Sequence, residues 1–279
     1  MGFGDWLKKR FGKQACGFCG KEVGMMSRDK IKGDVFLCHD CRHGCSSFIR
    51  VSRYTKDELL GHMEYMKRQG KLAELLSEQK GYRVPSAANQ GVIFYDDAGM
   101  FRIYDTDKDR KYTMEMIRYD QVAKYEPYLL EEGGEDGKEK TFKEGGVKIT
   151  LVGAQTDLSR MPKGLRAHPY IDQEITVRLS KDNMTYAENI IHHFDGIFGV
   201  NSDTKGLFSF GPTTQQKREG EALKAMGGMF KDAIKAAKTG EVSEDAKAKV
   251  QDAMNKVDDA ATMGLSKYSR LADEAEAKI

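Results

Sequence analysis

Four cysteines in two C-x2-C pairs constrain this chain more than any other feature. Cys16 and Cys19 form the first pair, Cys38 and Cys41 form the second, and 18 residues separate the two pairs. Two residues between cysteines let one tight turn direct both thiolates at a single ion, and zinc accepts four thiolates tetrahedrally at about 2.3 Å. Gly20 supplies the positive φ that the end of such a turn usually needs. The spacing therefore predicts a zinc ribbon or a related treble clef with one zinc ion per chain.

The same spacing also occurs in redox C-x-x-C motifs and in pairs of disulfides. A redox motif needs a βαβ context, which the surrounding sequence lacks, and a cytosolic chain disfavours structural disulfides. Four thiolates already complete the coordination of zinc, so Cys45, His39 and His43 are expected to be bystanders beside the ion. A complete set leaves no open coordination position, which makes the expected zinc structural and not catalytic.

Composition and charge favour a cytoplasmic protein. The 279 residues carry 45 basic and 43 acidic side chains, and the basic ones dominate residues 1–85 by 17 to 10. No segment is basic enough to require nucleic acid. No run approaches the roughly 18 apolar residues of a membrane span, and the N-terminus does not have the charge order of a secretory signal. We expect a cytoplasmic location, with peripheral membrane contact as the alternative.

Residues 1–14 are predicted to form a short amphipathic segment before the zinc module at residues 15–50. Its lysines and an arginine lie opposite one apolar helical face. The apolar face consists of Phe3, Trp6, Leu7 and Phe11. The segment could pack on the zinc module or lie on an anionic membrane surface.

A helical connector is predicted at residues 54–80. Thr55 and Glu58 have the spacing of a capping box, and Leu and Met residues follow at helical intervals. Gly70 is expected to divide this connector into two helices. The glycine- and proline-containing residues 81–91 are predicted to be a linker.

From residue 91 to residue 200 the apolar period changes to two. Six alternating runs predict strands, and a final amphipathic helix follows them, with Thr185 and Glu188 as a candidate capping box. The apolar face of that helix consists of Ile190, Ile191, Phe194, Ile197 and Phe198. The fold class is therefore α+β, with a small β-sandwich or barrel closed by one helix.

Residues 213–279 are predicted to form a helical hairpin with coiled-coil character. The first helix carries the stripe Leu223, Met226, Phe230 and Ile234. The second runs from Ser243 toward Ala277 and carries the stripe Val250, Met254, Val257, Ala261, Leu265, Tyr268 and Leu271. The second helix is longer by roughly 15 Å, so its far end has no partner within the hairpin. That end must dock on another domain, a second chain or a target, and weak self-association is the expected outcome.

The N-terminal stretch resembles an uncharacterised bacterial zinc-finger family. The residues that carry the resemblance are Cys16, Cys19, Gly20, Val23, Gly24, Gly33, Cys38 and Cys41. In that family the finger is often followed by a pleckstrin-homology-like domain, and the strands and helix of residues 91–200 look similar to such a domain. The function of that family is unassigned, so the resemblance implies an architecture and not an activity.

The common catalytic templates are missing from the sequence, which contains no P-loop, GxSxG, HExxH or GxGxxG string. The acidic run 105–109 imitates an EF-hand but lacks the glycine and the bidentate glutamate that calcium binding needs. We therefore expect no enzyme. The expected function is a zinc-containing adaptor that recognises protein or membrane partners through the pleckstrin-homology-like platform and the helical tail.

Nucleic-acid binding by the zinc module is the alternative function. Basic side chains that could contact phosphates are Lys21, Arg28, Lys30, Lys32, Arg42, Arg50 and Arg53. Aromatic side chains that could stack on bases are Phe18, Phe36 and Phe48, although they are also expected to be the small core of the module.

Overall fold

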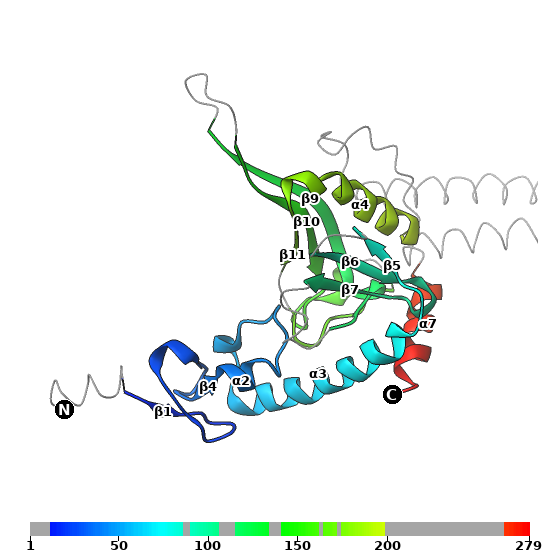
Figure 1. Cartoon of the computed structure of the whole chain (residues 1–279). Helices are drawn as coiled ribbons and strands as arrows, with labels where there is room; N and C mark the ends of the chain where they lie inside the picture. Colours follow the sequence, from blue (N-terminus) through cyan, green and yellow to red (C-terminus); the bar gives the residue numbers. More distant parts are fainter. Residues whose placement is uncertain are drawn as a thin grey trace, which may run out of the picture. The chain divides into compact units, whose positions relative to one another are not determined.

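The computed structural model combines helices with small antiparallel sheets (Figure 1). It describes residues 12–85, 90–105, 115–133, 141–161, 164–171, 174–198 and 265–279. The chain divides into two compact units, one of residues 1–80, 104–116 and 279 and the other of residues 81–103 and 117–278. Within the described ranges, no helix is long and apolar enough to cross a bilayer.

Two sets of sequence predictions fall outside the described residues. The first is the N-terminal amphipathic face of Phe3, Trp6, Leu7 and Phe11. The second is the tail up to residue 264, which includes the whole first helix of the predicted hairpin.

The first unit begins with two small hairpins and a short helix, which carry four of the five cysteines, and Cys45 follows in the turn after the helix. The hairpins pair β1 with β2 and β3 with β4 in antiparallel register. The elements in chain order are β1 (Gln14–Ala15), β2 (Glu22–Val23), η1 (Met25–Ser27), β3 (Arg28–Lys30), β4 (Phe36–Cys38), α2 (His39–Arg42) and η2 (Val51–Arg53).

A single long helix, α3 (Lys56–Ser77), follows these hairpins. Its capping box is confirmed, because the Thr55 amide donates to Glu58 Oε2 at 2.7 Å and the Glu58 amide donates to Thr55 Oγ1 at 3.4 Å. The predicted break at Gly70 is wrong. A helical glycine costs only about 1 kcal/mol, and one buried stripe continues on both sides of it. The buried residues are Leu59, His62, Met66, Gln69, Leu72, Ala73 and Leu76.

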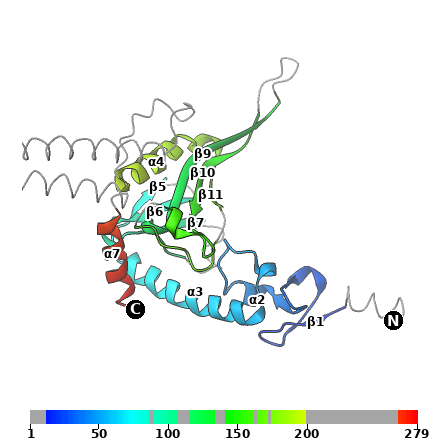
Figure 2. The ribbon, with the colours of Figure 1, turned by 180° about the vertical axis from the view of Figure 1, so that it is seen from behind.

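The second unit contains two open antiparallel sheets, and the described residues close no barrel (Figure 1, Figure 2). One sheet has the order β5-β6-β7-β8 and the other β11-β10-β9. The strands are β5 (Tyr82–Val84), β6 (Gln90–Tyr95), β7 (Met100–Asp105), β8 (Ile117–Arg118), β9 (Val122–Glu132), β10 (Thr141–Leu151) and β11 (Glu174–Leu179). Short 3-10 turns are η3 (Asp96–Ala98), η4 (Tyr119–Gln121), η6 (Leu158–Arg160) and η7 (Lys181–Asn183).

Strand β5 corrects the sequence analysis, which assigned residues 81–91 to a linker. Tyr82 pairs with Phe94 and Val84 pairs with Val92, so this short run adds an edge strand to β6. Three residues are too few to display a period of two, and only the partner strand makes them a strand. Of the six alternating runs that predict strands, the third is at residues 111–117. It lies mostly outside the described residues, and β8 covers its end.

Helix α4 (Thr185–Ile197) follows β11 and places Phe194 in an aromatic core. The Phe194 ring is fully buried and lies 4.9 Å from the ring of Tyr125, 5.1 Å from Phe94 and 5.2 Å from Phe101. Of the predicted apolar face, Ile191 is only half-buried. The predicted capping box at the start of α4 is wrong, because η7 leads into the helix and no side chain caps it.

The far end of the tail forms helix α7 (Ser266–Glu276), which docks on η3 and η4 of the second unit. Leu265 and Ala272 are fully buried, and the Tyr268 ring meets the Tyr119 ring edge-on with 5.3 Å between centroids. Docking on another domain was one of the three predicted destinations for this end. The described end of the stripe, from Leu265 onward, therefore has a partner within the chain.

Replacing Phe194 with Ala is expected to lower the free energy of unfolding by about 3–5 kcal/mol, because it leaves a cavity among five other aromatic rings. Denaturant unfolding of the full chain measures the change. Asn189→Ala, at an exposed position of the same helix, is the control and should have little effect. A loss below about 1 kcal/mol for Phe194→Ala would contradict the burial of this ring.

Candidate metal centre

The first cysteine pair lies in the tight turn between β1 and β2. The Gly20 amide donates to the Cys16 carbonyl and the Cys16 amide donates to the Lys21 carbonyl, both at 2.9 Å. Gly20 has a φ of 74°, the left-handed conformation that the sequence analysis expected there. Gly17 is required by space, since a Cβ built on it would lie 2.3 Å from Cγ1 of Val35.

The second pair lies where β4 ends and α2 begins. Cys38 is the N-cap of α2, and its sulfur accepts a hydrogen bond from the Cys41 amide at 3.4 Å. The two pairs therefore have different local structures, a hairpin turn and a helix start. This combination favours the treble clef over the zinc ribbon, which would place both pairs in hairpin turns.

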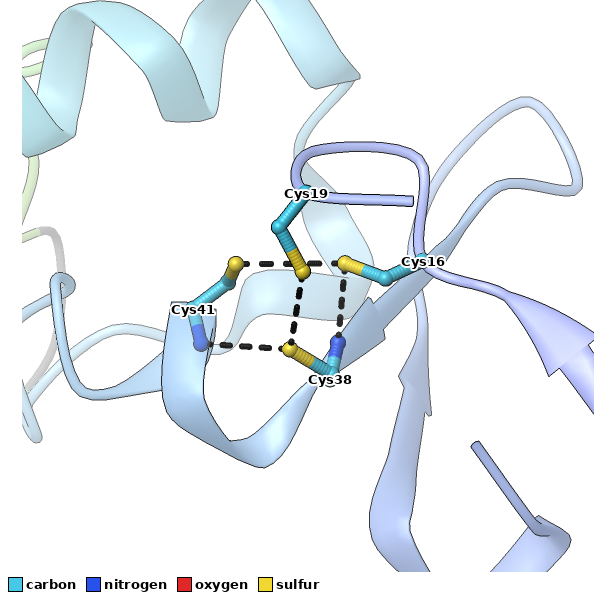
Figure 3. Close-up of side chains that lie close together, drawn as sticks. All are labelled: Cys16, Cys19, Cys38 and Cys41. Atoms are coloured by element: carbon cyan, nitrogen blue, oxygen red, sulfur yellow. Dashed lines mark hydrogen bonds between the residues drawn. The ribbon is translucent and has the colours of Figure 1, made fainter. Parts of the chain in front are cut away.

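The four sulfur atoms converge on one point, as Figure 3 shows. All four lie within 4.8 Å of one another, and the Cys16–Cys41 and Cys19–Cys38 sulfur pairs are 3.9 and 3.7 Å apart. Four sulfurs at 2.3 Å from a tetrahedral zinc ion would be about 3.8 Å apart. A disulfide would require about 2.05 Å, and all four cysteines are free thiols. The geometry therefore suits a metal ion and not two disulfides.

The thiols of this cluster have unequal acidities. Burial disfavours the Cys16 thiolate, but the amides of Cys19, Cys38 and Phe18 stabilise it and lower its pKa to about 6. The pKa values of Cys38 and Cys41 are raised, first by burial and then by neighbouring sulfur atoms. Four thiolates in this space would repel one another. A divalent cation removes the conflict, because a coordinating thiol loses its proton to the metal.

The three expected bystanders lie outside the four-sulfur group. Cys45 is completely buried, and burial raises its pKa to about 11, so it remains a neutral thiol at neutral pH. His39 begins α2 and His43 is the C-cap of that helix, and the two rings contact each other, with 3.1 Å between Nδ1 of His39 and Nε2 of His43.

A very small apolar core surrounds the sulfur cluster. Cys16, Val23 and Cys38 are its buried members, and Phe18 packs against them. Phe18 thus belongs to the core, as expected. The same module also buries Leu37 and Ile49, and the metal would tie its two hairpins together.

Comparison with known proteins supports the same interpretation. Residues 14–62 match a family described as a domain of unknown function, DUF4428. The match spans both hairpins, the cysteine cluster and the start of α3. No curated protein and no solved structure matches the chain. The DUF4428 match and the cluster together fit an N-terminal zinc-finger-like module.

The histidines of the second unit have structural partners. His193 lies on α4, its ring centroid is 4.0 Å from that of Phe94, and its Nε2 is 3.1 Å from Oδ1 of Asp96. His168, for which the sequence suggested no partner, is completely buried. Its Nδ1 accepts from the amides of Tyr170 and Ile171 at 3.2 and 2.9 Å, so it closes a local turn.

Sequence reasoning missed one polar cluster, centred on the buried Arg118. Its partners include Asp120, two residues away, and Asp273, 155 residues away. No local pattern connects positions so far apart. The alternation of neighbouring apolar residues could have indicated only that Arg118 falls in a buried stretch. The acidic run 105–109, which imitates the start of an EF-hand loop, lies almost entirely outside the described residues.

The purified protein is expected to contain one zinc ion per chain. Cys38→Ser should release it and unfold residues 16–45, because Cys38 supplies one sulfur and also begins α2, while the second unit keeps its own core. Metal analysis and circular dichroism of reduced protein measure both effects.

Cys45→Ala is the matched control, since Cys45 is equally buried but outside the cluster, and it should retain the zinc. Reduced wild-type protein without zinc would contradict the assignment.

Proposed function

We propose that this protein is a non-catalytic adaptor, in which a structural zinc module and a second domain provide binding surfaces for another protein. The observation that carries this proposal is the closed set of four sulfur ligands. Four cysteines complete the tetrahedral shell of zinc and leave no position for water or substrate. A zinc ion held in this way stabilises a fold and does not activate a reactant.

The second domain, at about residues 91–200, is proposed to be pleckstrin-homology-like. Three features support the assignment: a four-stranded sheet, a three-stranded sheet, and a helix that directly follows the last strand. Strands β6 and β11 lie next to each other, which brings the two sheets together, and α4 contacts both β9 and β10. Such a domain presents rigid sheet edges and turns, on which binding residues are commonly placed.

Four of the seven basic residues named for the zinc module make contacts within the module, and this weighs against the nucleic-acid alternative. Lys21 pairs with Asp40 and Lys30 pairs with Asp34. Arg28 donates to the Gly12 carbonyl and covers the ring of Phe36. Arg42 donates to the carbonyls of Cys45, Ser46 and Ile49. A phosphate backbone would have to compete with each of these contacts.

Peripheral membrane contact remains a second version of the adaptor proposal. It rests on the amphipathic pattern of residues 1–14, whose apolar face would enter the headgroup region while its basic residues meet anionic lipid. In either version we place the protein in the cytoplasm.

Three binding assays on the full-length protein distinguish these alternatives. We expect a protein partner to be captured reproducibly and in stoichiometric amount from native lysate. We expect little binding to anionic vesicles or to nucleic acid at physiological salt. Capture should persist in Cys45→Ala, the variant with an intact metal cluster.

Nucleic-acid affinity that falls steeply with salt would instead support the nucleic-acid function, since phosphate contacts release counterions. Sedimentation with anionic vesicles, lost in Trp6→Ala, would support the membrane version. Turnover of a small molecule by the pure protein would overturn the adaptor proposal.

A further inference from the structure

Arg118 is the buried centre of the contact between α7 and the rest of the second unit. Its side chain is 6% exposed, and that of Asp120 is completely buried. Nε and Nη2 of Arg118 donate to the two carboxylate oxygens of Asp120 at 3.0 and 2.8 Å. This two-point ion pair fixes the plane of the guanidinium group. The remaining nitrogen, Nη1, is thereby directed toward α7.

Helix α7 supplies two carboxylates to that free edge. Nη1 of Arg118 donates to Asp273 Oδ1 at 2.8 Å and to Glu276 Oε2 at 2.9 Å. Arg166 donates to both carboxylate oxygens of Asp273, at 2.8 and 2.9 Å. Residues three apart lie on the same helical face, so the two arginines recognise an acidic pair presented by a helix.

The surface around Arg118 is also shaped for a helix backbone. Gly99 has a φ of 61°, and a Cβ built on it would lie 2.1 Å from the Tyr268 carbonyl oxygen. Any other residue at position 99 would therefore hold α7 away. The small side chains of Ala272 and Ala275 on α7 are also buried. We call η3, Gly99, Arg118, η4 and Arg166 the helix-docking surface.

Helix α7 covers the edge of the unit's aromatic core, and its acidic face stays partly in solvent. The rings around Phe194 come from β6, β7, η4, β9 and α4, and α7 joins them at the periphery through Tyr268, whose ring meets that of Tyr119. The carboxylates of Asp273 and Glu276 remain 47% and 37% exposed. Ion pairs that stay partly solvated contribute modestly to stability, so replacing these two carboxylates by those of another helix costs little.

We propose that the helix-docking surface is a binding site for acidic helices, that the chain occupies it with its own α7, and that a partner protein binds by displacing α7. The partner helix would carry an aromatic residue at the position of Tyr268, small residues at those of Ala272 and Ala275, and carboxylates at those of Asp273 and Glu276. This inference rests on the proposal that the second unit is a binding platform.

A competing helix displaces α7 only above a minimum concentration or affinity. Helix α7 belongs to the same chain, so its docking is intramolecular, and a competitor must exceed the effective concentration that the covalent connection provides. Sixty-six residues separate Phe198 from Leu265 in the sequence. A weak or unspecific acidic helix would be excluded, and only a partner present at high local concentration or with better contacts would bind.

The test uses the full chain with a specific protease recognition sequence inserted after Ala260. Cleavage leaves residues 261–279 held only by the contacts of α7. The probe is a fluorescein-labelled peptide of residues 261–279, and its binding to the cleaved protein is followed by fluorescence anisotropy. We expect the labelled peptide to exchange with the bound segment and to be displaced by unlabelled peptide.

Two competitor peptides with matched charge distinguish specific docking from general electrostatic attraction. Asp273→Lys removes a ligand of both arginines and should weaken competition by about ten-fold or more. Glu274→Lys makes the same charge change at an exposed position and should compete within about two-fold of the wild-type peptide. Equal competition by the two peptides would overturn the proposal.

Further outcomes are equally decisive. Loss of cooperative unfolding once residues 261–279 leave would make α7 an integral part of the fold and overturn the proposal. A dimer of the intact chain that is lost in full-length Asp273→Lys would assign the surface to a second copy and overturn occupancy by its own helix. A cleaved protein that exchanges no peptide but still captures its lysate partner would retain the adaptor function and lose only this surface.

Discussion

The convergence of four sulfur atoms within 4.8 Å is the constraint on which the N-terminal hairpins depend. Without a metal ion the thiols have opposing protonation preferences, because the amides around Cys16 favour a thiolate while burial holds Cys38 and Cys41 neutral. A divalent cation satisfies all four at once. An ion bound there would couple metal binding to the folding of this module.

Features that depend on neighbours in sequence could be predicted from the residues alone. The cysteine pairs, the positive φ at Gly20 and the capping box of α3 each need only a few adjacent positions. The buried Phe194 followed from helical periodicity. The error at Gly70 has a physical reason, because the propensity cost of one glycine is smaller than the gain from a buried stripe that continues past it.

Features that depend on distant partners could not be predicted. Strand β5 forms because its backbone pairs with β6, and its three residues are too few to show an alternation of apolar and polar side chains. The expectation of a sandwich or barrel came from alternation, which indicates strands but does not determine whether a sheet closes. The pairing of Arg118 with Asp273 spans 155 residues and joins a strand end to a helix that sequence periodicity assigned to a coiled coil.

That same separation gives the protein an order of assembly during synthesis. At 5–20 residues per second, a ribosome reaches Asp273 on the order of 10–30 s after Arg118. Arg118 can pair with Asp120 as soon as both residues have been synthesised. Its Nη1 has no acceptor on α7 until that helix has also been synthesised. A nascent chain thus exposes its arginine edge before its own helix exists. A partner present at the ribosome would meet an open surface and would not need to displace anything, so the time of encounter could decide which helix is bound.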